Sequence, residues 1–192
     1  YQDIVHRYLA TLKTHTFDEL KTLFTLSQSV ATQYQATWGK ALLIESLQRG
    51  SAIQMEWIEA VKMTPDPKGH FLCALGTFRL WKYKETLKIL IPLWPRMRES
   101  RDVKILLALT LNRCRKHRAA DQLLWTLIKS GHDIDEKAVL LSITISNCIH
   151  SGNEDKARQI VLDYEAELIK SKLYGYFLRN SATLFQGETA NS

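Results

Sequence analysis

The chain has little proline and little glycine, with four and eight of these residues among 192. Both residues penalise the interior of a helix, so their scarcity predicts long uninterrupted helices. The sequence also lacks any apolar run near the roughly 20 residues that a membrane-spanning helix needs. We therefore expect an all-α protein without a transmembrane segment.

Cysteine is scarce as well, and Cys73, Cys114 and Cys148 each fall within a predicted helix. An odd number at such positions does not make a disulfide framework, so we expect free thiols in a reducing, cytoplasmic compartment. Histidines follow closely after Cys114 and Cys148, but these are only pairs, and a structural zinc ion needs about four ligands. We predict no metal and no cofactor.

Motifs of catalysis are missing too, since no glycine-rich phosphate loop and no pair of catalytic carboxylates is present. His70 and Cys73 lie one helical turn apart, where a base and a nucleophile would be neighbours. No orienting group or oxyanion loop accompanies them, so a catalytic pair is not favoured. We expect a protein that is not an enzyme.

What the sequence does contain is an excess of positive charge: 26 Lys and Arg residues against 20 Asp and Glu, a net charge of +6. This balance favours anionic partners and speeds encounter with them. It does not select between protein, nucleic acid and membrane surfaces.

Apolar residues recur at helical spacing through most of the chain and are interrupted by short polar breaks. Thr16 and Glu19 form a capping-box pattern at one helix start, and Pro65 and Pro67 separate two helices. The predicted helices cover residues 3–14, 17–30, 37–48, 51–63, 70–80, 83–93, 103–111, 138–149 and 174–184, with further helices beginning near Ala120 and Ala157.

These helices form pairs, because short amphipathic helices bury their apolar stripes only against a neighbour. The second helix of each pair is expected to approach the first at an equivalent position. We place these positions at Met55, Thr86, Ala120 and Ala157, which are 31, 34 and 37 residues apart. Such a period predicts a stack of helical hairpins.

A two-helix unit with a period near 34 residues resembles the tetratricopeptide repeat. The best local matches are Ser151-Gly152 with Ala157 and Val161, and Leu75-Gly76 with Trp81-Lys82-Tyr83 and Leu87. Pro65 and Pro67 lie where that family has its proline between repeats. The sequence departs from the family at Met55, Thr86, Leu43 and Ile145, where small residues are usual.

The resemblance implies a superhelical stack of antiparallel hairpins in one domain over residues 1–185. An N-terminal hairpin covers residues 1–33, four repeats cover 36–66, 67–100, 101–134 and 137–170, and a capping helix covers 173–185. Residues 186–192 have the composition of a flexible tail.

In such a stack the first helix of each hairpin lines the concave face. Residues that precede each equivalent position by the same number of places are expected to line this face together. They predict a groove with cations and hydrogen-bond donors along one side and apolar residues in its middle. The predicted partner-binding residues are Lys40, Gln48, Lys68, Phe71, Phe78, Arg79, Ile105, Asn112, Arg113 and His150.

A second basic feature is the polar break after the helix at 103–111, which has the side chains of a possible anion patch: Arg113, Arg115, Lys116, His117 and Arg118. One interpretation is a phosphate or nucleic-acid site, and the other is a solvated turn in which cations favour the C-terminal end of a helix.

Among the five tryptophans, most are expected in the core. Trp94, which lies between two prolines, is expected to be exposed.

Together these features predict a non-catalytic scaffold that holds an acidic or amphipathic segment of another protein in a basic, partly apolar groove. A chaperone or a component of a secretion or assembly complex is one form of this prediction that the resemblance implies. The alternative is a module that binds nucleic acid or another anionic polymer through residues 113–118. The sequence does not indicate an oligomeric state.

Overall fold

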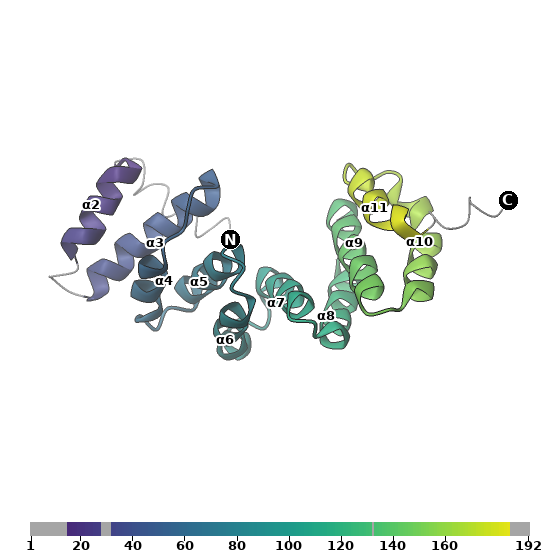
Figure 1. Cartoon of the computed structure of the whole chain (residues 1–192), viewed down its shortest axis with the longest axis horizontal. Helices are drawn as coiled ribbons and strands as arrows, with labels where there is room; N and C mark the ends of the chain where they lie inside the picture. Colours follow the sequence, from purple (N-terminus) through teal and green to yellow (C-terminus); the bar gives the residue numbers. More distant parts are fainter. Residues whose placement is uncertain (1–14, 28–31, 132, 185–192) are drawn as a thin grey trace. The chain divides into compact units, whose positions relative to one another are not determined.

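The computed structural model describes residues 15–27, 32–131 and 133–184, which form helices and turns without a β-strand (Figure 1). In chain order the helices are α2 (Phe17–Ser27), α3 (Thr32–Arg49), α4 (Met55–Lys62), α5 (Pro67–Arg79), α6 (Tyr83–Leu93), α7 (Arg101–Arg113), α8 (His117–Ser130), α9 (Ile134–His150), α10 (Glu154–Leu168) and α11 (Tyr174–Ser181). Two 3₁₀ turns are η1 (Trp94–Arg96) and η2 (Ala182–Leu184). The predicted helix over 3–14 and the predicted tail over 186–192 lie outside the described residues. The all-α class is confirmed for the described part.

The chain groups into two compact units, residues 1–103 and 104–192, where the sequence predicted one domain over 1–185. In the first unit α2 packs on α3, α3 on α4, α4 on α5 and α5 on α6 (Figure 1). In the second unit α9 packs on α8, α10 and α11. From α2 to α6 and from α8 to α11, helices that are neighbours in the chain are therefore neighbours in space, as predicted for hairpins.

Each unit has its own apolar core. Trp57 of α4 is fully buried in the first core, among side chains of α2, α3 and α5. Phe177 of α11 is fully buried in the second core, among side chains of α8, α9 and α10. Burying a large apolar side chain stabilises a fold by about 1.5–3 kcal/mol. The segment predicted as a capping helix thus does cover the second core, as α11 and η2.

Side-chain caps explain where several helices begin. Thr16 and Glu19 exchange hydrogen bonds with each other's backbone N–H at the start of α2, which confirms the predicted capping box. The Asp66 carboxylate accepts from the N–H of Lys68 at 3.0 Å, and Pro67 opens α5. The Asp133 carboxylate accepts from the N–H groups of the first turn of α9.

Helices α3, α5, α7 and α9, the predicted first helices of the four repeats, end in the same way, with one residue in the left-handed conformation at or just after the helix end. The N–H of the following residue then donates to the carbonyl five positions back, at 2.9–3.1 Å, as in a Schellman motif. The left-handed residues are Gly50 (φ 72°), Trp81 (φ 62°), Arg115 (φ 58°) and Gly152 (φ 75°). They are 31, 34 and 37 residues apart, which is the spacing that the sequence predicted for the hairpins.

At two of these breaks the left-handed residue is not glycine. A left-handed conformation costs a non-glycine residue about 1–2 kcal/mol. Trp81 and Arg115 bear this cost, and both side chains are exposed. The unfavourable backbone is thus not offset by burial of either side chain.

The equivalent positions in the second helices are mostly buried, as a close approach between helices requires. Ala120 and Ala157 are fully buried, and Met55 is half-buried. Thr86 is also fully buried, and its hydroxyl oxygen lies 3.0 Å from that of Thr77 on α5. A hydrogen bond between α5 and α6 therefore compensates for a threonine where the resemblance favours a small apolar residue.

Some predicted boundaries were wrong. The helix predicted over 51–63 begins only at Met55, because residues 51–54 form a connection without regular structure, in which the side chain of Ile53 is buried in the first core. The helix predicted over 70–80 begins earlier, at Pro67, because Asp66 caps it. The helix predicted over 37–48 also begins earlier, at Thr32.

Gly152→Ala is expected to lower the free energy of unfolding of the second unit by about 1 kcal/mol. A Cβ added at Gly152 meets nothing within 4 Å, so the cost comes from the left-handed backbone alone. Urea unfolding followed by circular dichroism measures the change.

The matched control is Gly175→Ala in α11, where an added Cβ also meets nothing within 4 Å but no left-handed conformation is required. Alanine within a helix is favoured over glycine by roughly 0.5–1 kcal/mol, so this variant should be at least as stable as the parent. Equal effects of the two substitutions would contradict the assigned backbone conformation at position 152.

The three thiols are expected to differ in their reactivity. Cys73 is fully buried, its S–H donates to the carbonyl of Ile58 at 3.5 Å, and burial raises the pKa of its thiol to about 12. Burial also raises the pKa of the Cys148 thiol, whereas Cys114 is only half-buried. Because the thiolate is the nucleophile, maleimide at mildly alkaline pH should label Cys114 first. Rapid labelling of Cys73 in the folded protein, detected by peptide mass spectrometry, would contradict its place in the core.

Candidate functional site

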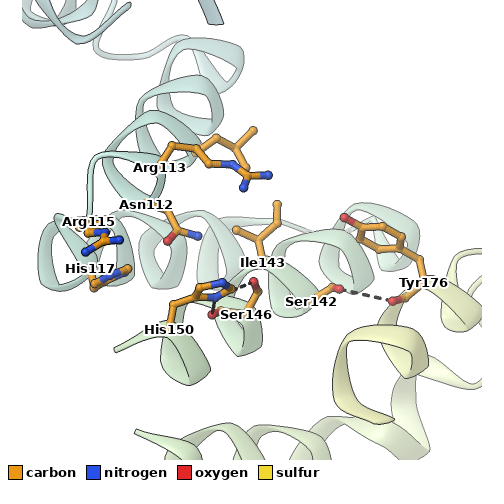
Figure 2. Close-up of a pocket in the computed structure, with 10 residues that line it drawn as sticks. Asn112, Arg113, Arg115, His117, Ser142, Ile143, Ser146, His150 and Tyr176 are labelled. Atoms are coloured by element: carbon orange, nitrogen blue, oxygen red, sulfur yellow. Dashed lines mark hydrogen bonds between the residues drawn. The ribbon is translucent and has the colours of Figure 1, made fainter. Parts of the chain in front are cut away.

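A pocket of about 520 Å³ lies in the second unit, where the end of α7, the turn into α8, and helices α9 and α11 meet (Figure 2). It is lined by Leu109, Asn112, Arg113, Arg115, His117, Ser142, Ile143, Ser146, His150 and Tyr176. The lining includes two arginines and two histidines and no aspartate or glutamate. The pocket therefore carries positive charge that its own walls do not neutralise.

The two arginines come from either side of a left-handed break. Arg113 is the last residue of α7, and Arg115 is the left-handed residue itself. Both are exposed, and within the described part of the chain neither guanidinium has an ion-pair or hydrogen-bond partner. The side-chain amide of Asn112, one position before Arg113, is likewise unengaged by the described residues. These groups supply hydrogen-bond donors that the fold itself does not use.

His117 is held by a buried asparagine from the facing helix. Its Nδ1 lies 2.7 Å from Oδ1 of Asn147, and Nδ2 of Asn147 donates to the backbone carbonyl of His117 at 3.0 Å. Because a carbonyl only accepts, the amide nitrogen must face it, so the amide oxygen faces Nδ1 and Nδ1 carries the proton. Nε2 is the ring nitrogen that this arrangement leaves for a ligand.

His150 is held in a similar way at the last turn of α9. Its Nδ1 lies 2.6 Å from the carbonyl oxygen of Ser146, so this nitrogen also carries a proton (Figure 2). A positive charge at the C-terminal end of a helix is favoured by the helix dipole. Both imidazoles are thus fixed through Nδ1, and each is able to present Nε2 to an anion when protonated.

The rest of the lining is less polar and joins α9 to α11. Leu109 and Ile143 provide apolar surface, together with the ring of Tyr176. Ser142 is buried, and its hydroxyl donates to the backbone carbonyl of Tyr176 at 3.4 Å (Figure 2). This bond ties α11 to the wall of the pocket. The lining therefore combines hydrogen-bond donors with apolar side chains, which suits a binding site for an amphipathic ligand.

Several residues predicted from the sequence do meet in this pocket. Asn112, Arg113 and His150 come from the predicted groove, and Arg115 and His117 come from the predicted anion patch. Two separate predictions thus describe parts of one site. The remaining members of the patch, Lys116 and Arg118, are exposed but do not line the pocket, and Ile105 is half-buried against the second core.

The predicted groove residues of the first unit have other surroundings. Phe71 is only 3 % exposed and belongs to the interior, so its predicted role as an exposed apolar anchor is corrected. Lys40 is paired with Asp66 at 2.6 Å. Phe78 is half-buried and packs edge-on against Tyr83. The remaining two, Gln48 and Lys68, are exposed.

Arg79 is the clearest case of a predicted binding residue that the fold uses itself. Its Nη1 donates to the carbonyls of Ser46 at 3.0 Å and Leu47 at 3.3 Å, which belong to the last turn of α3. The guanidinium also passes close to Gly50, since a Cβ added there would lie 3.3 Å from Nη2. Arg79 therefore caps the C-terminal end of the preceding first helix.

Sequence reasoning missed the residues that hold and complete the pocket. Ser146 lies four positions before His150, and this helical spacing is a signal that the sequence does contain. Asn147 is a buried polar residue on a helix that was read only as apolar. Tyr176 comes from α11, and no spacing pattern connects it with the other lining residues.

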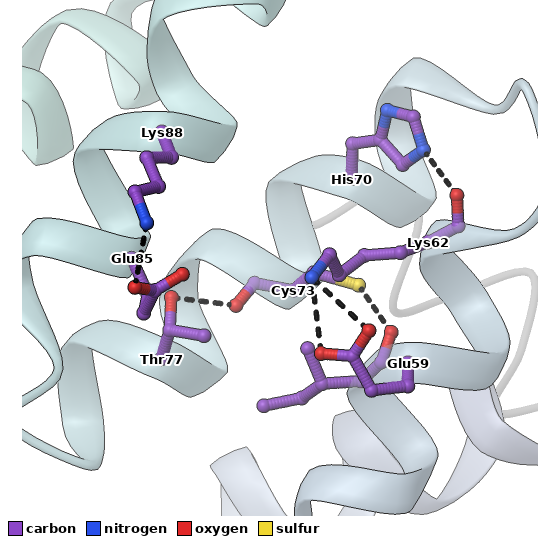
Figure 3. A network of polar contacts seen from close by, with 8 residues as sticks. Glu59, Lys62, His70, Cys73, Thr77, Glu85 and Lys88 are labelled. Atoms are coloured by element: carbon purple, nitrogen blue, oxygen red, sulfur yellow. Dashed lines mark hydrogen bonds and ion pairs between the residues drawn. The ribbon is translucent and has the colours of Figure 1, made fainter.

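The His70 and Cys73 pair does not form a reactive couple (Figure 3). Nε2 of His70 lies 3.3 Å from the carbonyl oxygen of Lys62, while the Cys73 thiol faces the carbonyl of Ile58. The side chain of Lys62 is itself paired with Glu59 at 3.0 Å. Each group therefore has its own partner.

The tryptophan predictions were also partly wrong. Trp94, which was expected to be exposed, is half-buried, and Trp81 is 73 % exposed although most tryptophans were expected in the core. Its place at a left-handed break explains the difference, because this residue lies outside both helices of its hairpin. Its ring contacts that of Tyr83 edge-on at 6.1 Å between centroids.

Comparison of the chain with family models, curated proteins and solved structures finds no match. Over the residues with described structure, no group of three His, Cys, Asp or Glu side chains is placed to hold a metal ion. Over the same residues, no helix combines the length and apolar character needed to cross a membrane.

Arg79→Ala is expected to destabilise the first unit by about 1.5–3 kcal/mol, the range for hydrogen bonds that involve a charged group. Arg113→Ala is the matched control, because Arg113 also ends the first helix of a hairpin but makes no such bond within the described chain. It should change the free energy of unfolding by less than about 0.5 kcal/mol. Urea unfolding of both variants measures the difference, and equal stability would show that Arg79 does not act as a cap.

Proposed function

We propose that this protein is a non-catalytic binding module that holds an acidic segment of a partner protein, with the pocket of the second unit taking an anionic side chain. The observation that carries the proposal is the uncompensated charge of Arg113 and Arg115 beside two histidines fixed through Nδ1. Arginine binds carboxylates and phosphates through a planar fork of donors. The apolar wall of Leu109 and Ile143 suits a partner segment that is amphipathic.

The repeated helical breaks support a wider form of this proposal. Four breaks of the same geometry, spaced 31, 34 and 37 residues apart, are what a stack of tetratricopeptide-like hairpins would need. In such a superhelical stack, further partner contacts would come from exposed residues such as Gln48 and Lys68. A scaffold of this kind in a chaperone or an assembly complex, in a reducing compartment, agrees with three free cysteines.

A second candidate function is binding of nucleic acid. The side chains that favour it are Arg115, Lys116 and Arg118, which are all exposed around the turn between α7 and α8. The local pocket favours the first proposal, because a nucleic acid backbone is contacted along an extended surface.

Arg115→Gly tests the proposed function without the usual risk to the fold. Glycine adopts φ 58° freely, so the variant removes the guanidinium and should not reduce stability. The affinity for a fluorescein-labelled peptide that alternates leucine with glutamate should fall about tenfold or more, since a charge-assisted hydrogen bond contributes about 1.5–3 kcal/mol. Fluorescence anisotropy measures the affinity.

The matched control is Arg118→Ala, which removes an equal charge from the start of α8, three positions away and outside the pocket. Its effect on the affinity for the peptide should be less than about threefold, as for an exposed charge. Equal losses in the two variants would show that net charge, rather than the pocket, drives binding. Preferential binding of a thymidine oligonucleotide, with affinity that falls steeply with salt, would favour the second candidate.

A further inference from the structure

We infer that the pocket of the second unit recognises a phosphate monoester on the partner segment, a phosphorylated serine or threonine side chain, in preference to a carboxylate. This inference rests on the proposed function and names the group that the partner would present. Three properties of the pocket support it: its charge, the positions of its hydrogen-bond donors in the fold, and its volume and apolar lining.

The permanent charge of the lining matches a dianion. Arg113 and Arg115 together contribute two positive charges, and no acidic residue is among the lining residues. One carboxylate would neutralise only one of these charges. A phosphate monoester carries a charge of about −1.5 to −2 at neutral pH and would neutralise both.

The donors around the pocket come from three separate parts of the fold. Arg113 and Asn112 end α7, Arg115 lies in the turn that leads to His117 at the start of α8, and His150 ends α9. Each imidazole offers Nε2 as a donor when the ring is protonated, because Nδ1 is already engaged. A carboxylate has two acceptor oxygens in one plane, whereas a phosphate monoester has three that point in different directions. A phosphate is therefore better able than a carboxylate to accept hydrogen bonds from donors that lie on three elements.

The shape of the site favours a monoester over a polyanion. A volume of about 520 Å³ is large enough for a phosphorylated side chain and a neighbouring residue, and Leu109, Ile143 and Tyr176 offer that neighbour an apolar wall. The remaining cations of the turn, Lys116 and Arg118, do not line the pocket. A nucleic acid would leave the apolar wall without a partner, since its backbone is charged throughout.

Three blocked tripeptides test the inference on the full chain: acetyl-Leu-phosphoserine-Leu-amide and its counterparts with glutamate and with serine at the central position. Isothermal titration calorimetry measures each affinity. We expect the phosphoserine peptide to bind about tenfold or more tightly than the glutamate peptide, and the serine peptide to bind weakest. Arg113→Ala and Arg115→Gly should each reduce the preference for phosphoserine, and Arg118→Ala should leave it unchanged.

The alternative outcomes separate this inference from the proposed function. Equal affinity for the phosphoserine and glutamate peptides would overturn the inference and leave binding of acidic segments intact. Inorganic phosphate that binds as tightly as the phosphoserine peptide would also overturn it, because the site would then take free phosphate. Absence of binding by all three peptides, with binding of the thymidine oligonucleotide retained, would overturn both proposals.

Discussion

The left-handed residue that ends the first helix of each hairpin is the constraint on which the rest of the structure depends. It closes the last carbonyls of one helix with its own N–H and that of the next residue, and it turns the chain within a few residues. The following helix can then lie back against the first. Gly50 and Gly152 meet the constraint without strain, while Trp81 and Arg115 meet it at an energetic cost.

The same constraint creates the pocket. The break at Arg115 separates the end of α7 from the start of α8 by only three residues, so Arg113, Arg115 and His117 are held near one another. The facing helix supplies Asn147, which fixes His117, and His150, which brings a further ring. The left-handed break at Arg115, which reverses the chain, therefore also brings positively charged side chains together between α7 and α8.

The sequence predicted the repeating part of this structure well, and the physical reason is that helix breaks depend on local residues. The spacing of 31, 34 and 37 residues was read from second-helix positions and is repeated by the left-handed residues. The site was predicted only in part. Arg79 and Arg113 occupy the same place in their hairpins, and nothing local distinguishes the one that caps α3 from the one left for a ligand. Phe71 and Tyr176 were misjudged or missed because burial and contacts between distant helices are set by packing.

The contrast between Arg79 and Arg113 also explains why the charged site belongs to the second unit. The Arg79 guanidinium donates hydrogen bonds to the carbonyls of Ser46 and Leu47, so its positive charge stabilises the C-terminal end of α3. Arg113 has no such acceptor among the described residues, and its neighbour Arg115 is a second unmatched charge. An anion in the pocket would face both charges, and the attraction between opposite charges would favour its binding. The fold therefore leaves two cations at this break for an anionic ligand.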